Sequence, residues 1–345
     1  MLKKLEAIRG LAAVYVVIHH IIGFTTIKDI ISPMMRFPFR FGQEAVIVFF
    51  LLSGFVIHYS TYNKKIEFKT YVLKRFRRIY PIAICSMILS VFVFWFNNYN
   101  FTITDVYQLF GNLLMLQDTS NKPGLWVDVF LKNHALWSLS YEWFFYLLYF
   151  PLINILKHDK LRIYKILGIS TVSWFSYLIY PNHFSLVVSY LIIWWVGVEC
   201  ASIFRQYGNF KFSDILPLLI CLFFITMLSF IPVISQYYQG TLEFNPIKFP
   251  IITARHFGFS GFVILIGWLW WNCKLYGFNF LIGYFDKFAS LSYALYLVHF
   301  PIIWLVIPLL TNLWLIIIVK IFLMLVIAYI LERKFQPFIN NIIKI

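Results

Sequence analysis

The sequence predicts an all-α membrane protein that crosses the bilayer about ten times, with both chain ends in the cytoplasm. Of its 345 residues, 61% are hydrophobic and only 12% are charged. A soluble domain is about 45–50% apolar and about 25% charged. A chain of this length could not hide so much apolar surface from water, so its solvent is the lipid bilayer. Aromatic residues reach 21%, as expected where rings gather at the two membrane interfaces.

Apolar runs near the length that crosses about 30 Å of hydrocarbon recur along the chain. They lie at residues 6–24, 42–60, 79–96, 134–156, 161–179, 184–204, 213–234, 255–273, 288–309 and 312–331. No polar segment between them is long enough for a second domain, so residues 1–345 are expected to form one membrane-embedded domain. The longest connection, 97–133, is expected to carry a short surface helix.

The basic residues give the predicted orientation, because Lys and Arg concentrate in cytoplasmic loops. With the N-terminus inside, 21 of the 29 Lys and Arg residues, including Lys344 in the tail, fall on the inner side. The net charge of +15 is therefore assigned to topology and to contact with anionic lipid or phosphorylated ligands, and not to nucleic acid. The four cysteines are scattered singly, with no CxxC pair or Cys/His cluster, so no metal site is predicted.

Two ionisable residues share the first span, where an unpaired charge costs several kcal/mol. Arg9 and His20 are eleven residues apart, which brings them within about 20° of one helix face and about 16 Å apart along the axis. His20 then lies near mid-membrane, and histidine is the usual proton-transfer residue near neutral pH. His19 points about 100° away from His20 and is the poorer candidate. The alternative for His20 is a structural histidine bonded to a neighbouring carbonyl.

The fourth and ninth spans also carry polar groups. Glu142 lies among aromatic residues, where a carboxylate must be neutralised or paired. His20 is its predicted partner, and a structural ion pair or a protonated carboxyl is the alternative. Ser292, Tyr296 and His299 recur at i, i+4 and i+7, which forms one polar stripe on a helix. Such a stripe either packs against another helix or lines a cavity.

Arg75 and Arg78 form an R-x-x-R-x-x-P pattern with Pro81 at the predicted cytoplasmic mouth of the third span. The guanidinium fork matches the oxygens of a phosphate group. Positive-inside charge explains most basic residues of this loop better. These two are singled out because they lie on the same side of the membrane as Arg9.

Taken together and in this order, these segments resemble the acyltransferase 3 family of bacterial membrane acyltransferases, which includes O-antigen and other polysaccharide O-acetyltransferases. The resemblance covers essentially the whole chain. It rests on Leu5–Ala13 followed by His20, on Phe49-Phe-Leu-Leu-Ser-Gly-Phe-Val-Ile57, on Arg75-x-x-Arg78-x-x-Pro81, on Trp137-Ser-Leu-Ser-x-Glu142, and on Ser292–Pro301. The chain departs from the family at Ile47, where many members carry an Asp, and its nearest acid is Glu44.

The resemblance implies a membrane O-acyltransferase of the bacterial inner membrane. It would move an acyl group, expected to be acetyl, from cytoplasmic acetyl-CoA to a hydroxyl of an extracytoplasmic glycan or cell-surface carbohydrate. Acyl-CoA is thus the expected donor substrate, and no metal is expected. Arg75 and Arg78, with Arg9, would hold the phosphates of CoA.

The remaining matched positions imply the chemistry. His20 would act as general base on the acceptor hydroxyl or carry the acyl group briefly, and Glu142 would orient it. Tyr296 and His299 would line the path or bind the acceptor. The other class considered is a transporter or flippase of lipid-linked saccharides, which repeated halves with broken helices would favour; the sequence shows no such repeat. Self-association and the identity of the acceptor are left open.

Overall fold

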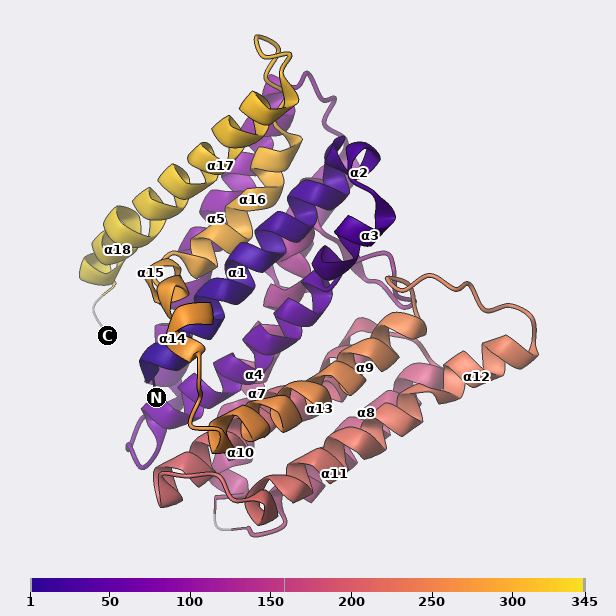
Figure 1. Cartoon of the computed structure of the whole chain (residues 1–345), viewed down its shortest axis with the longest axis vertical. Coiled ribbons are helices and arrows are strands. Elements are labelled where there is room, and N and C mark those ends of the chain that lie inside the picture. The colour runs from indigo at the N-terminus through magenta and orange to yellow at the C-terminus, as the bar shows by residue number, and fades with distance from the viewer. Residues whose placement is uncertain (1, 158, 344–345) are drawn as a thin grey trace.

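The computed structural model describes residues 2–157 and 159–343 as a bundle of long helices (Figure 1). Lys344, predicted to lie on the inner side, is outside the described residues. The longest helices are α1 (Leu2–Phe24), α4 (Gly42–Thr61), α5 (Phe68–Phe96), α7 (Trp137–Ile155), α8 (Arg162–Ile179), α10 (Leu191–Tyr207), α11 (Phe212–Ser229), α13 (Ile251–Asn272), α16 (Ser292–Trp304) and α17 (Leu313–Ile330).

Shorter elements connect these helices or extend them. They are α2 (Ile27–Ile30), α3 (Pro33–Arg36), α6 (Ile103–Leu113), α9 (His183–Ser189), α12 (Ile231–Tyr238), α14 (Phe278–Leu281), α15 (Asp286–Ala289) and α18 (Gln336–Ile342). The tighter turns are η1 (Phe37–Phe39), η2 (Phe130–Lys132), η3 (His134–Leu136) and η4 (Gly283–Phe285), and η5 (Leu331–Phe335) is a π-helical turn. One pair of two-residue parallel strands, β1 (Gln117–Asp118) and β2 (Val127–Asp128), lies between α6 and α7.

The all-α, multi-pass class predicted from the sequence is confirmed. Among the described residues, 7 helical stretches are long and apolar enough to cross a membrane: Leu2–Phe24, Pro33–Thr61, Phe68–Phe96, His183–Tyr207, Phe212–Tyr238, Ile251–Asn272 and Leu313–Ile342. Every interval expected to span the membrane contains a helix. The start of α1 and the end of α18 lie on the same side of the bundle (Figure 1). The count of ten spans and the cytoplasmic location of the termini remain predictions.

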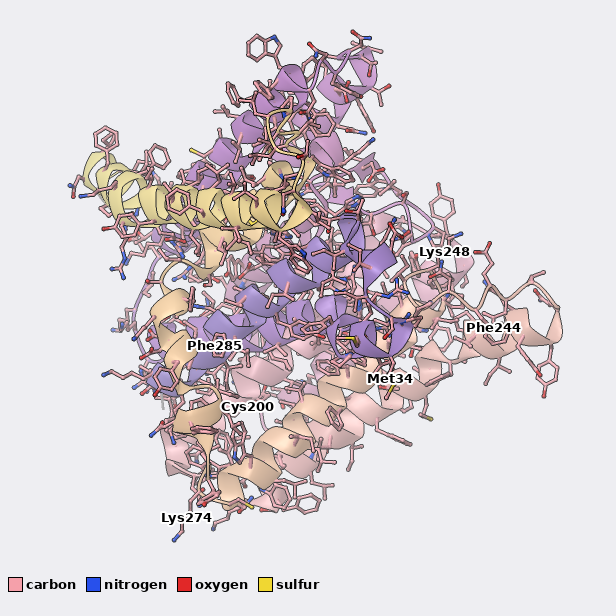
Figure 2. The ribbon with its side chains drawn as sticks, turned by 45° about the horizontal axis from the view of Figure 1, so that its top comes forward. Met34, Cys200, Phe244, Lys248, Lys274 and Phe285 are labelled. Atoms are coloured by element: carbon pink, nitrogen blue, oxygen red, sulfur yellow. The ribbon has the colours of Figure 1, made fainter. Side chains whose placement is uncertain are left out.

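The outer surface of the bundle is apolar in the way that lipid contact requires. On α17, Ile318 and Phe322 each expose 63% of their surface, and soluble monomers rarely expose large contiguous apolar patches. Two lysines lie instead just beyond the ends of α13. Lys248 precedes α13 and Lys274 follows it, at opposite ends of that helix (Figure 2). The bundle thus presents an apolar belt to its surroundings.

Several helix boundaries differ from the predicted ones, and two of these differences have a bearing on the site. Helix α5 begins at Phe68, well before the expected start of the third span, so Arg75 and Arg78 lie within a helix and not at its first turn. Helix α16 ends at Trp304, short of the predicted residue 309. It ends there because the Asn97 amide donates to the Trp304 carbonyl (2.8 Å) and accepts from the Val306 N–H (3.1 Å).

Helices α4 and α10 pack through glycine. A Cβ atom placed on Gly54 would lie 2.0 Å from the backbone oxygen of Trp194, and one on Gly197 would lie 2.1 Å from that of Leu51. Small residues at such contacts allow two helix backbones to approach closely in a membrane. No larger side chain fits at either position without moving one helix.

The connection between α5 and α7 is folded, and its second half, from Met115 onward, is largely buried. The predicted surface helix is α6, whose first turn is capped where the Thr102 N–H donates to Asp105 (2.7 Å). Farther on, Lys122 donates to Asp118 (2.9 Å), and the Tyr141 hydroxyl donates to the same carboxylate (2.6 Å). Burial alone raises the pKa of Asp118, but Lys122 and the other neighbours outweigh burial and hold that pKa well below its usual range.

The close helix contact at Gly197 predicts that one added methyl group lowers the stability of the fold there but not at an uncrowded glycine. Gly197→Ala is expected to lower the free energy of unfolding by about 1–3 kcal/mol, as overpacking does, because the obstructing atom belongs to a backbone. Gly168→Ala on α8 is the control, since nothing lies within 4 Å of its added Cβ. Thermal unfolding in detergent, followed by tryptophan fluorescence, measures both. Equal midpoints for the two variants would contradict the close contact.

The buried ion pair between Lys122 and Asp118 predicts a loss of stability that a second substitution restores. Lys122→Met leaves the Asp118 carboxylate buried without its cation and is expected to cost about 3–5 kcal/mol. Adding Asp118→Asn should restore most of that stability, because the uncompensated charge is gone. Folding lowers the pKa of Asp118. The ion pair therefore stabilises the fold fully at pH values above the unfolded pKa of about 3.9, and this stabilisation is lost as the pH falls below that value toward the folded pKa. A double variant no more stable than Lys122→Met would argue against the pairing.

Candidate active site

A cavity of about 450 Å³ opens among α1, α4, α5, α7 and α16, within the usual size range of small-molecule sites. We call it the arginine cavity. It brings together five of the predicted site residues, which are Arg9, Arg75, Arg78, Glu142 and Tyr296. The other polar residues of its lining are Glu6, Ser53, Tyr59, Ser60, Ser138, Tyr146, Ser292 and Tyr293. Segments that are far apart in the sequence therefore bring several charged and polar side chains around one cavity inside an apolar bundle.

The three arginines are held to different degrees. Arg78 makes a two-pronged ion pair with Glu332 on η5, with distances of 2.6 and 3.0 Å. Arg9 donates one hydrogen bond, to the Ala289 carbonyl (3.0 Å). Arg75 lies over the ring of Tyr71, 5.5 Å from its centroid. The Nε atoms of Arg9 and Arg75 are buried and have no partner among the described residues. Two guanidinium groups thus keep donors for a ligand.

Glu142 is held by hydroxyl groups. Ser53 on α4 donates to its Oε1 (2.7 Å), and the Tyr146 hydroxyl, one turn along α7, donates to the same oxygen. The two hydroxyls are also 3.0 Å apart. The predicted pairing of Glu142 with His20 is wrong: no hydrogen bond among the described residues joins them. Helix packing turns Glu142 toward α4 and the arginine cavity instead.

His20 pairs with a second histidine. His20 Nδ1 and His299 Nε2 are 3.0 Å apart, with one nitrogen donating to the other according to the tautomer. The rings stack at 5.0 Å with 18° between their planes. His299 is fully buried, and it, not Glu142, is the side chain that contacts His20. His19 points elsewhere, as predicted, and contacts the Phe39 carbonyl (2.5 Å).

Tyr296 connects the arginine cavity to the histidine pair. It lines the cavity, shares a hydrogen bond with Ser138 (2.9 Å), and its ring lies 5.9 Å from that of His299. The ring of Phe300 lies 4.4 Å from that of His20 and also contacts His134. The histidine pair therefore contacts both a residue that lines the arginine cavity and an aromatic cluster.

Three residues of this arrangement were not found by sequence reasoning. Ser53 is part of the Phe49–Ile57 segment and Tyr146 is four residues after Glu142, so helical spacing could have found both. Glu332 gave no signal, because its partner Arg78 is 254 residues away. Among the described residues, no group of three or more His, Cys, Asp or Glu is placed to hold a metal ion.

The position where many family members carry an Asp is apolar core in this protein. Ile47 is fully buried. Glu44, the nearest acid, pairs with Arg255 on α13, and its second oxygen is buried without a partner among the described residues. Glu44 lines a different, mostly apolar cavity and is absent from the arginine cavity. It does not take the place of the missing Asp.

The fold and the site together define a multi-pass helical membrane protein with a basic internal cavity beside a partly buried histidine pair. A family profile described as an acyltransferase domain matches residues 2–333. The chain belongs to the acyltransferase 3 family.

One curated relative is the acyltransferase MdmB of Streptomyces mycarofaciens, to which the chain is 35% identical over 113 residues. The match covers 32% of this chain and 28% of that protein, so it spans well under a third of the relative's length. The search of solved structures found no match.

The two hydroxyl donors predict how Glu142 responds to substitution. Glu142→Ala removes the acceptor that Ser53 and the buried Tyr146 share and leaves them only the contact with each other, so it is expected to cost about 1–3 kcal/mol of stability. Glu142→Gln keeps a side-chain oxygen and should cost less. Chemical or thermal unfolding of the detergent-solubilised variants gives the comparison. Equal stability of the alanine and glutamine variants would show that the contacts of Ser53 and Tyr146 with Glu142 do not stabilise the fold.

Proposed function

We propose that the protein transfers an acyl group, acetyl in the first instance, from cytoplasmic acyl-CoA to a hydroxyl of an extracytoplasmic glycan or cell-surface carbohydrate. The observation that supports the proposal is the arginine cavity, whose lining residue Tyr296 lies next to His299 of the His20–His299 pair. Family membership supports acyl transfer. The proposal includes the predicted ten spans, with the N-terminus, the C-terminus and the mouth of the arginine cavity facing the cytoplasm of a bacterial inner membrane.

The donor would be held by charge. Arg75 and Arg9 have buried donors without partners, and a guanidinium bonds phosphate oxygens strongly. Arg78 is already paired with Glu332, so it contributes a fixed fork with part of its charge neutralised. A phosphate group near the cavity mouth would satisfy the free donors and direct the thioester inward toward Tyr296.

The histidine pair would move the proton. His20 Nδ1 faces His299, which leaves Nε2 for substrate. His20 Nε2 accepts the proton of the acceptor hydroxyl, the hydroxyl oxygen bonds to the thioester carbon, and the carbon–sulfur bond breaks. The proton then passes to the thiolate, which leaves as the thiol of CoA. A brief acyl-imidazole on the same nitrogen is the other route, and it also requires His20.

The proposal predicts different outcomes for two adjacent histidines. His20→Ala should lower acyl transfer by about 100- to 10,000-fold, the usual size of a general-base contribution. His19→Ala, matched in residue type and depth, should retain most of the activity because His19 faces the Phe39 carbonyl. The assay follows radiolabelled acetate released from acetyl-CoA, or transferred to membrane glycans, at matched amounts of folded protein.

Normal transfer by His20→Ala would overturn the chemistry proposed for this residue. Wild-type protein that neither binds acetyl-CoA nor hydrolyses it, but moves lipid-linked saccharide across vesicles, would favour the transporter class instead.

A further inference from the structure

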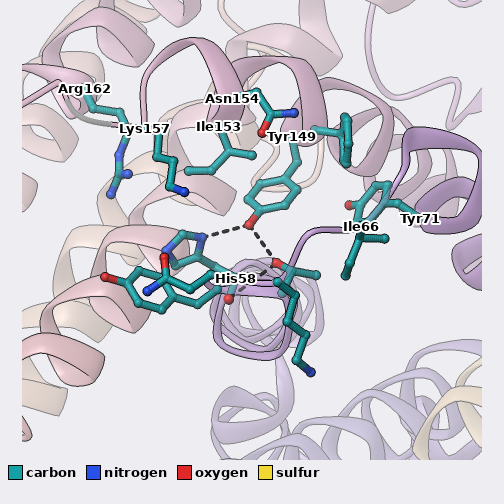
Figure 3. Close-up of a pocket in the computed structure, with 13 residues that line it drawn as sticks. His58, Ile66, Tyr71, Tyr149, Ile153, Asn154, Lys157 and Arg162 are labelled. Atoms are coloured by element: carbon teal, nitrogen blue, oxygen red, sulfur yellow. Dashed lines mark hydrogen bonds between the residues drawn. The ribbon is translucent and has the colours of Figure 1, made fainter.

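A second cavity, of about 200 Å³, lies where the end of α4, the start of α5, the end of α7 and the start of α8 meet (Figure 3). We call it the His58 cavity. His58 Nδ1 contacts the Tyr149 hydroxyl (2.8 Å), which also contacts Thr61 Oγ1 (2.9 Å). His58 Nε2 contacts the Ser202 hydroxyl (2.8 Å). Both nitrogens of His58 are therefore occupied, and this buried residue forms part of a rigid polar wall.

The cavity is positively charged. Lys64, Lys157 and Arg162 line it, and no acidic side chain does. Arg162 donates two hydrogen bonds to the Glu199 carboxylate, at 2.7 and 2.6 Å. Lys64 and Lys157 are exposed and form no ion pair among the described residues. In Figure 3, Lys157 projects into the space between Arg162 and Tyr149. Two free ammonium groups thus lie at the opening.

Aromatic rings form the rest of the lining. Tyr62, Tyr71 and Phe150 contribute to it together with Tyr149. The Tyr71 hydroxyl is buried and has no hydrogen-bond partner among the described residues. Rings combined with lysines can bind a phosphorylated base by stacking and charge together. A phospholipid headgroup would use the lysines but would have no need of the rings.

Tyr71 also connects this cavity with the candidate active site. It lines the His58 cavity, and the guanidinium of Arg75, which lines the arginine cavity, lies over its ring at 5.5 Å. The two cavities are therefore neighbours on either side of one aromatic side chain. A long donor anchored near Arg75 has a second basic, aromatic site within reach.

We propose that the His58 cavity binds the phosphorylated adenosine end of acyl-CoA. The identity of the ligand rests on the proposed function. Lys64 and Lys157 bind the 3′-phosphate at the opening, and the aromatic wall receives the adenine ring. This site selects the donor by its nucleotide, whereas the arginine cavity holds the acyl-bearing end.

The test measures binding of CoA, 3′-dephospho-CoA and adenosine 3′,5′-bisphosphate to the full-length protein in zwitterionic nanodiscs. Wild type should bind CoA roughly tenfold more tightly than dephospho-CoA, the scale of one charge-assisted contact. Lys64→Met and Lys157→Met should each lose most of this preference. Lys65→Met is the matched control, because Lys65 is the next residue along the chain and does not line the cavity.

Equal binding of CoA and dephospho-CoA by wild type would overturn the proposal, as would equal losses in Lys64→Met and Lys65→Met. Adenosine 3′,5′-bisphosphate that fails to bind, combined with lysine-dependent binding of short-chain phosphatidylglycerol, would assign the site to lipid and also overturn it. Acyl transfer from S-acetyl-pantetheine, which has no nucleotide, separates the two proposals. That reaction should be lost in His20→Ala and unchanged in Lys157→Met. It therefore tests the proposed function even if the proposed nucleotide site is wrong.

Discussion

The backbone contact between α4 and α10 is the constraint on which the site geometry depends. Gly54 and Gly197 remove the side chains that would hold the two helices apart. Ser53 is the residue next to Gly54, and with α4 seated against α10 its hydroxyl reaches Glu142 on α7 at 2.7 Å. A hydrogen bond weakens within a few tenths of an ångström, so a displacement of α4 relative to α7 would weaken it. Packing of the smallest residue thus fixes the position of a charged one.

The cost of placing ions in lipid explains which residues the sequence could predict. Arg9, Glu142 and Tyr296 were identified one at a time, because each polar group in an apolar span needs an individual reason. The structure gathers them around one cavity. The segment from Trp137 to Glu142 and the stripe from Ser292 to His299 likewise lie on the helices expected for them. Residue type and helical spacing were sufficient for this part.

Partners and helix ends could not be predicted in the same way. His20 bonds to His299 and not to Glu142, because the rotation of each helix about its axis depends on contacts with residues far away in the sequence. The early end of α16 depends on Asn97, which is 207 residues from Trp304. A hydropathy pattern reports only on residues that are close in sequence, so it cannot predict such long-range contacts. The same limit hid the ion pair between Arg78 and Glu332.

That ion pair has a consequence for how the protein is made. Arg78 is synthesised early, while Glu332 follows 254 residues later, in the turn after α17. His20 similarly waits for His299, 279 residues downstream. During membrane insertion, Arg78 and His20 must therefore lie in the first helices without their final partners. Both contacts form only after α16 and η5 have been synthesised, so a partly translated chain lacks the Arg78–Glu332 ion pair and the His20–His299 contact.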